Sequence, residues 1–197
     1  MKIKLFGIRI YISVFFCAII AFMLIIDTTG IMSLSLIAVL VHELGHFVCM
    51  QRLGCCTQRI EMTLYGIIVT GSPFKTVKEE VLTALSGPLF NLLAAAVAMS
   101  VGCLLKGRSL CMLAAVNFAI GTINMLPVHG LDGGTVISGV VGAMLKEATA
   151  RRICSWISFI TVTGLIFFGV WVAFAKADNP SVLLFAVYLL IFNILKQ

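Results

Sequence analysis

The sequence predicts an all-α polytopic membrane protein with about six transmembrane helices and one short strand loop near residues 60–71. Three observations lead to this prediction. Of the 197 residues, 61% are hydrophobic and only 11% are charged, whereas soluble domains are about half apolar and about a quarter charged. The apolar residues gather in long runs. The 14 Lys and Arg residues gather in short clusters between those runs, as basic residues do beside membrane spans.

This composition also excludes several classes of protein. Too few polar residues are present to cover a water-facing surface, which excludes a soluble enzyme and a disordered chain. Membrane-flanking clusters account for the net charge of +6, so no nucleic-acid partner is expected. The seven cysteines are odd in number, lie mostly in apolar runs and form no CxxC pair. Neither a disulfide framework nor a thiolate zinc site is therefore expected.

A helix of about 20 residues is long enough to cross the hydrocarbon core of a bilayer. The chain has six apolar segments near this length, which are 8–26, 31–50, 82–105, 109–126, 153–175 and 181–195. Basic residues precede the first segment, as in a signal peptide. No small-residue cleavage site follows it at Asp27, so we predict a membrane helix there.

The longest polar-leaning stretch, 51–81, separates the second and third spans. Within it, residues 60–71 are rich in β-formers and contain glycines, which predicts a short strand pair that dips into the membrane surface. Strands exposed to lipid leave backbone groups without hydrogen bonds, so this pair is expected to pack on protein or to line a wet cavity. The charged stretch 75–80 is expected to begin the third helix.

The basic residues also predict an orientation. With six spans, eleven of the 14 Lys and Arg residues lie on one side of the membrane and three lie on the other. Cytoplasmic loops carry the excess of Lys and Arg. We therefore predict a multi-pass protein of the cell membrane, with both termini in the cytoplasm and a single domain over residues 1–197.

The most informative motif is His42-Glu43-Leu44-Gly45-His46, inside the second span. Residues i and i+4 share one face of a helix, so His42 and His46 can present two imidazoles to one metal ion. Glu43 is adjacent and could reach a water molecule at that ion. Ionisable side chains within a membrane are costly and are usually functional. The motif therefore predicts a zinc site, with the packing of two structural histidines as the alternative.

Zinc needs a third protein ligand and one open position. The candidates are Glu61, Glu79, Glu80, His129, Asp132 and Glu147. The fourth span ends near Pro127, and the glycine-rich segment that follows can fold back in the same leaflet as the histidines. This depth favours Asp132 as the third ligand, with His129 as the runner-up. An alternative role for Asp132 is that of a helix N-cap.

Three stretches together resemble one known family. His42–His46, combined with 124–127 and 131–134, is similar to the site-2 protease family of intramembrane zinc metalloproteases. A further stretch, 86–91, resembles the small-Gly-Pro-x-x-Asn segment of that family. The similarity covers a core of about 31–145. The short chain is most like the branch with the stage IV sporulation protease, which trims a membrane-tethered precursor of a transcription factor. Neither a PDZ domain nor a C-terminal regulatory domain is expected within 1–197.

The resemblance implies a function as well as a fold. It implies a Zn²⁺-dependent endopeptidase that cuts a peptide bond in or beside a transmembrane segment, with Glu43 as general base and His42, His46 and Asp132 as metal ligands. It also implies that Asn124 helps to hold substrate, the alternative being a polar residue that caps the fourth span. Asn91 is interpreted as a helix-packing residue.

The implied substrate is a membrane-tethered protein, such as a transcription factor precursor or an anti-sigma factor, and an inhibitory membrane partner is compatible with the family. Two other functions remain open. A catalytically silent, zinc-dependent protein that binds membrane helices would not need Glu43. A cation transporter would need a polar path across both leaflets, but the outer halves of the spans are almost purely apolar.

Overall fold

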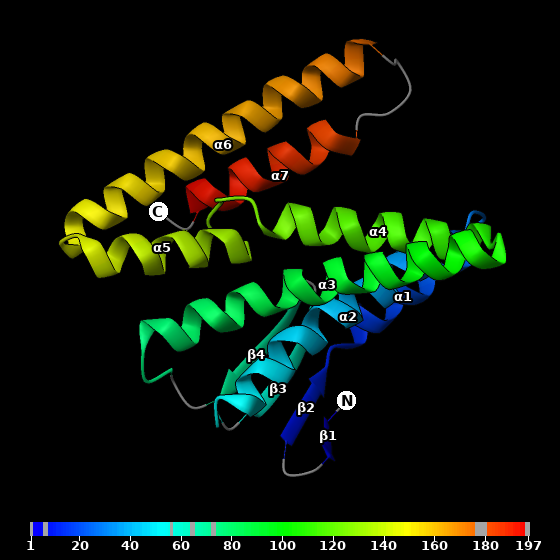
Figure 1. Cartoon of the computed structure of the whole chain (residues 1–197), viewed down its shortest axis with the longest axis horizontal. Helices are drawn as coiled ribbons and strands as arrows, with labels where there is room; N and C mark the ends of the chain where they lie inside the picture. Colours follow the sequence, from blue (N-terminus) through cyan, green and yellow to red (C-terminus); the bar gives the residue numbers. More distant parts are fainter. Residues whose placement is uncertain are drawn as a thin grey trace. The chain divides into compact units, whose positions relative to one another are not determined.

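The computed structural model describes residues 2–5, 8–55, 57–63, 66–71, 74–175 and 181–195. Two compact units make up the chain, residues 1–122 and residues 123–197. The elements, labelled in Figure 1, are β1 (Lys2–Leu5), β2 (Ile8–Ile12), α1 (Val14–Ile26), α2 (Ile31–Arg52), β3 (Thr57–Thr63), β4 (Gly66–Gly71), α3 (Val77–Leu105), α4 (Arg108–Asn124), α5 (Asp132–Met144), α6 (Glu147–Ala175) and α7 (Ser181–Leu195).

Helices make up most of the described residues, and the first unit also contains a four-stranded sheet in the order β1-β2-β3-β4. β1 and β2 pair in antiparallel fashion, as do β3 and β4. β2 and β3 run parallel, with Arg9 opposite Arg59, because α1 and α2 carry the chain back between them. The strand pair expected near 60–71 corresponds to β3 and β4, whereas β1 and β2 had not been expected. The approach of the pair to the membrane surface stays a prediction.

The first predicted span, 8–26, is wrong as a single helix. Its opening residues form β2, and only Val14–Ile26 forms a helix, α1, of 13 residues. The segment Ile8–Ile12 alternates isoleucine with Arg9 and Tyr11. This period of two and the β-branched side chains favour a strand. The prediction failed because both segments are apolar, and hydrophobicity alone does not show where a strand ends and a helix begins.

The N-terminus of α2 is held by Asp27. Its Oδ2 accepts hydrogen bonds from the backbone N–H and the hydroxyl of Ser33, each at 2.9 Å. The backbone bond from Ser33 is the main reason that the pKa of Asp27 lies below its ordinary value of 3.8. The carboxylate thus satisfies an amide in the first turn that has no partner within the helix.

We expect Asp27→Ala to speed hydrogen exchange at the Ser33 amide. The protection depends on the ionised carboxylate, so its pH dependence follows from the lowered pKa. The contribution is present above the pKa of the unfolded chain, about 3.9, and is lost as the pH falls through the lower pKa of the folded chain. Exchange measured for both proteins across this range checks the prediction. Equal rates in the two proteins at neutral pH would contradict it.

Helices α2 and α3 pack against each other through small residues. The buried residues of α3 recur every three or four positions and are mostly small, namely Thr83, Ala84, Gly87, Pro88, Asn91, Ala95, Ala98 and Gly102. The buried residues of α2 are Ala38, His42 and Gly45. Small residues let membrane helices approach closely. As a result, polar side chains in the two helices can reach each other's backbone.

The second unit has a separate core. Val128, Val162 and Leu189 are its fully buried members, and they come from the segment before α5, from α6 and from α7. The sequence predicted that 127–152 connects the fourth and fifth spans. The structure places α5 there and begins α6 at Glu147.

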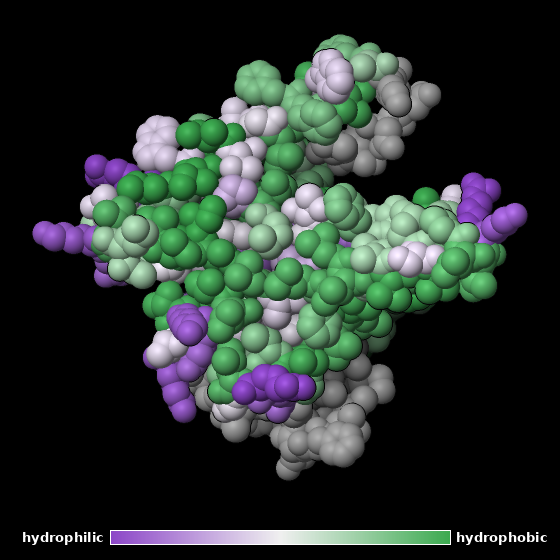
Figure 2. Space-filling view, viewed as in Figure 1, coloured by the Kyte–Doolittle hydropathy of each residue, from purple (hydrophilic) through white to green (hydrophobic). Residues whose placement is uncertain are grey.

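Three helices among the described residues are long and apolar enough to cross a membrane: α2, α3 and α6. α1, α4 and α7 are shorter, so the total of six spans stays a prediction. Apolar side chains cover most of the surface in view in Figure 2, and hydrophilic residues gather at its edges. Exposed aromatic residues along α6, such as Phe167 and Trp171, have the character of a lipid-facing surface. The chain is therefore a membrane protein with several apolar helices, and its orientation stays a prediction.

Candidate metal centre

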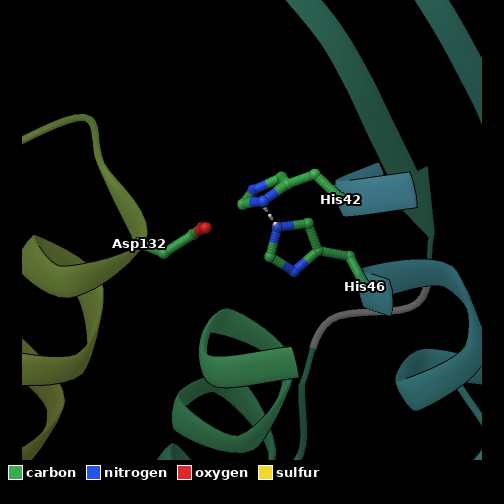
Figure 3. Close-up of side chains that lie close together, drawn as sticks. All are labelled: His42, His46 and Asp132. Atoms are coloured by element: carbon green, nitrogen blue, oxygen red, sulfur yellow. Dashed lines mark hydrogen bonds between the residues drawn. The ribbon is translucent and has the colours of Figure 1, made fainter. Parts of the chain in front are cut away.

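Two histidines on one face of α2 form the centre of the candidate site. His42 is buried, with 6% of its surface exposed, and its ring lies edge-on to that of His46 at a centroid distance of 4.7 Å. Their Nε2 atoms are 3.1 Å apart, as the dashed line in Figure 3 indicates. The structure thus confirms that the spacing of four residues brings the two imidazoles together.

The other ring nitrogens both face oxygen atoms of α3. The Nδ1 of His46 lies 2.8 Å from the backbone carbonyl oxygen of Thr83, which can only accept a hydrogen bond. The Nδ1 of His42 lies 2.7 Å from Oδ1 of Asn91, which is also an acceptor. Each Nδ1 therefore carries the ring proton in the neutral form and donates it to α3.

It follows that each Nε2 carries a lone pair, and the two lone pairs converge. Two acceptors at 3.1 Å repel each other unless a positive charge lies between them. Two nitrogen ligands on tetrahedral zinc, at 2.0–2.1 Å each, would be about 3.3 Å apart. The histidine pair therefore fits a zinc ion in donor type, in protonation and in spacing.

Gly87 of α3 forms the floor of this site. An added Cβ would overlap the Nε2 of His46 and would lie 2.9 Å from the Cε1 of His42. The next residue, Pro88, has no backbone N–H and so leaves the carbonyl of Ala84, next to Thr83, without its usual helical donor. The glycine and the proline thus allow α3 to approach the imidazoles without a side chain between them.

Glu43 follows His42 directly in α2, where it is half-buried. Its carboxylate is therefore fixed to the same helix as both imidazoles. A carboxylate next to a polarised water molecule can accept a proton from it.

Asp132 belongs to the second unit, where it is the first residue of α5 (Figure 3). It is half-buried and lies at the helix N-terminus, where the helix dipole favours an ionised carboxylate. The unwound segment predicted after Pro127 extends over 128–131, and α5 begins directly after it. The N-cap of α5 is Leu131, so the alternative role of Asp132 as the N-cap is wrong. A carboxylate oxygen and two imidazole nitrogens are ligand types that zinc accepts.

The first turn of α5 is stacked directly on the segment that precedes it. A Cβ on Gly133 would overlap the carbonyl oxygen of Met125, and one on Gly134 would overlap the carbonyl oxygen of Val128. The backbone also closes on itself there, since the N–H of Leu131 donates to Val128 at 3.0 Å. The position of Asp132 within its unit is set by this backbone contact.

Two further residues singled out from the sequence, Asn124 and His129, lie shortly before Asp132 in the chain. Asn124 is the last residue of α4 and is half-buried. The backbone N–H of His129 donates to the hydroxyl of Ser158 in α6 at 3.0 Å. His129 lines a cavity of about 690 Å³, together with Glu147 and Arg151.

Asn91 has a larger part in this site than the sequence indicated. Asn91 was interpreted as helix packing, but it is fully buried and bonds to His42. An amide within an apolar helix was the available signal. The direction in which it points depends on how α3 faces α2, which the sequence does not encode locally.

Comparisons with known proteins find similar sequences and a similar fold. The sequence family described as Peptidase family M50 matches residues 106–168. The chain is 29% identical over 161 residues to Rip3, a candidate zinc metalloprotease of Mycobacterium tuberculosis, in each of two strains. That alignment covers 71% of this chain, which spans about two fifths (41%) of the length of these curated relatives. Among solved structures, the fold is similar to a site-2 protease from Methanocaldococcus jannaschii, with a TM-score of 0.67, 19% identity and coverage of 96% of this chain and 91% of the other.

Proposed function

We propose that this chain is an intramembrane zinc metalloprotease related to the site-2 proteases, which hydrolyses a peptide bond within or beside a transmembrane segment of a membrane-tethered protein. The observation that carries the proposal is the convergence of two imidazole lone pairs, 3.1 Å apart, on a helix apolar enough to cross a membrane. The match to Peptidase family M50 and the similarity to Rip3 support it.

His42, His46 and Asp132 are the proposed zinc ligands. The two imidazoles offer Nε2, because their Nδ1 atoms face the oxygens of α3. Asp132 offers a carboxylate oxygen from the start of α5. Three protein ligands leave a fourth position open, as catalytic zinc sites require. When bound, zinc acts as a Lewis acid toward the scissile carbonyl and lowers the pKa of water at the open position.

Glu43 is the proposed general base. It accepts a proton from the attacking water molecule and later passes that proton to the leaving amine. Its position next to His42 in α2 places it on the same helical turn as a proposed ligand. The burial of His42 limits the access of bulk water to its imidazole, and fewer water molecules strengthen the electrostatic interactions of that ring.

The proposed substrate is a membrane helix that unwinds locally before it is cut, since the carbonyls of an intact helix are engaged in hydrogen bonds. Among the strands that the structure describes, β4 pairs with β3 alone, so an unwound segment can add to it as a further strand. Asn124, at the end of α4, is proposed to hold the substrate. A transcription factor precursor or an anti-sigma factor is the kind of tethered protein we expect, and cleavage at the cytoplasmic face follows from the charge asymmetry of the loops.

The experiment is co-expression with a membrane-tethered reporter whose transmembrane segment contains Gly and Pro. We expect Glu43→Gln to lower the cleavage rate by about 10²- to 10⁴-fold while the zinc content of the purified protein is unchanged. Asp132→Ala should lower the zinc content itself.

The results separate the assignments. Full cleavage by Glu43→Gln would remove Glu43 from the mechanism, and full zinc content in Asp132→Ala would remove Asp132 from the ligand set. A wild-type chain that captures the reporter, binds zinc and never cuts it would instead be a binding protein.

A further inference from the structure

A chain of buried amides runs from α4 through α3 to His42. The Nδ2 of Asn117 donates to the backbone carbonyl of Leu113, within α4, at 2.9 Å. Its Oδ1 accepts a hydrogen bond from Nδ2 of Asn91, also at 2.9 Å. The same Nδ2 of Asn91 donates to the backbone carbonyl of Ala38 in α2 at 2.9 Å. Asn91 and Asn117 are 0% and 1% exposed, so water does not compete for these bonds.

This chain of bonds has only one consistent direction. The carbonyl oxygens of Leu113 and Ala38 accept and cannot donate. The carbonyl of Leu113 therefore requires the NH₂ group of Asn117 as its donor, which turns Oδ1 of Asn117 toward Asn91. Both Ala38 and Oδ1 of Asn117 then require the NH₂ group of Asn91. The Oδ1 of Asn91 is left to face His42, and a flipped amide would set acceptor against acceptor at buried contacts.

We propose that Asn91 is a positioning residue for the metal centre, which holds His42 in the Nδ1–H tautomer so that Nε2 presents its lone pair to the zinc ion. The proposal rests on the proposed function in so far as zinc is the ion that Nε2 binds. The tautomer itself follows from the hydrogen bonds between α2 and α3. Asn91 touches neither the reacting atoms nor the ion and acts through His42 alone.

The two imidazoles obtain their orientation from different sources. His46 is oriented by the backbone carbonyl of Thr83, which no substitution of a side chain removes. His42 is oriented by the side chain of Asn91. Partners of this kind fix the tautomer and the ring plane of a metal-binding histidine, and their loss typically lowers metal affinity by 10- to 100-fold. Asn91 is therefore the position at which the orientation of His42 can be tested.

The test uses Asn91→Leu and Asn91→Asp in the full chain, purified in detergent. Leucine is close to asparagine in size and fills the same space, but it cannot accept a hydrogen bond. Aspartate has the same shape and keeps an acceptor for Nδ1–H, but it loses the NH₂ group that donates to Ala38 and Asn117. The matched control is Ser100→Ala in α3, which removes only a bond within that helix, to the carbonyl of Ala96. Zinc affinity is measured by competition with a chelator of known affinity.

We expect zinc affinity to fall by about 10- to 100-fold in Asn91→Leu and to stay near that of wild type in Ser100→Ala. Asn91→Asp should bind zinc more tightly than Asn91→Leu, because it keeps the acceptor for Nδ1–H of His42 although both variants lose the donors to Ala38 and Asn117. A residue that only packs the helices would give a different pattern, since Leu would then serve as well as Asn. Wild-type zinc affinity in Asn91→Leu would overturn the proposal.

A second measurement does not depend on any substitution at Asn91. The chain has three histidines, so imidazole ¹⁵N resonances of the zinc-free wild-type protein can be assigned with single His→Gln variants. In its neutral form His42 should carry its proton on Nδ1. A proton on Nε2 would overturn the proposal. Weak zinc binding by a wild-type chain whose His42 keeps Nδ1–H would instead contradict the proposed function and leave the tautomer assignment standing.

Discussion

Gly87→Ala is expected to abolish stable zinc binding and to lower cleavage by at least about 100-fold, the order of loss that follows when a reacting group is misplaced by about 1 Å. The reason is the close approach of α3 to the histidine pair. The added methyl group would overlap the Nε2 and Cε1 of His46 and would crowd the Cε1 of His42. These are the atoms that would bind or border the ion.

Neither helix has an easy way to relieve this overlap. Gly45 of α2 faces the backbone of α3, since an added Cβ there would lie 2.6 Å from the carbonyl oxygen of Ser86. The two backbones are thus already in contact next to the site. The methyl group must therefore rotate the imidazoles away from their acceptors on α3 or separate the helices. Each response breaks the arrangement that directs the two lone pairs to one point.

The measurement is zinc content and reporter cleavage in Gly87→Ala beside Gly164→Ala. Gly164 lies in α6, and an added Cβ there would meet no atom within 4 Å, so the control changes a membrane helix in the same way without crowding. We expect Gly164→Ala to keep its zinc and its activity. Normal zinc content in Gly87→Ala would show that α3 does not form the floor of the metal centre.

Gly134→Ala is expected to displace Asp132 and to lower both zinc affinity and cleavage. An added Cβ would overlap the carbonyl oxygen of Val128, and its neighbour Gly133 has the same relation to Met125 and Leu126. The first turn of α5 therefore lies on backbone, which cannot rotate away as a flexible side chain can. Overpacking of this kind costs about 1–3 kcal/mol of folding free energy, and it acts two residues from the proposed ligand.

Gly142→Ala is the matched control, because Gly142 lies in the same helix and an added Cβ would meet nothing within 4 Å. Alanine is favoured over glycine within a helix by about 0.5–1 kcal/mol, so this variant should be at least as stable as wild type. Thermal unfolding in detergent, zinc affinity and cleavage are compared for the two proteins. If Gly134→Ala matched Gly142→Ala in all three, the stacking of α5 on 125–128 would not position Asp132.

Several features of the site were predictable because they depend on local geometry. The separation of His42 and His46 by four residues places them on one helical face in any α-helix. Glu43 then lies beside them. The length and apolar character of α2, α3 and α6 likewise follow from composition alone, since a membrane helix satisfies its backbone hydrogen bonds within itself.

Other features were misjudged because they depend on contacts between distant segments. The glycine-rich connection after Pro127 was expected to be unwound, and it is unwound only as far as Leu131. Gly133 and Gly134 disfavour a helix, yet the structure forms the first turn of α5 there, and the two glycines are the residues that let this turn lie on the carbonyls of 125–128. Contact with the preceding backbone thus outweighs local propensity, and it requires glycine at both positions.

The types of the proposed ligands on α2, their spacing and the apolar character of the helices could be predicted from the amino acids alone, because each depends on residues close together in the chain. The direction in which the two imidazoles are turned depends on contacts between distant residues. Asn91 lies 49 residues from His42 and Thr83 lies 37 residues from His46. These bonds exist because small residues let α2 and α3 pack backbone to backbone. The acceptors on α3 then assign one proton to each Nδ1 and direct both Nε2 lone pairs to the same point.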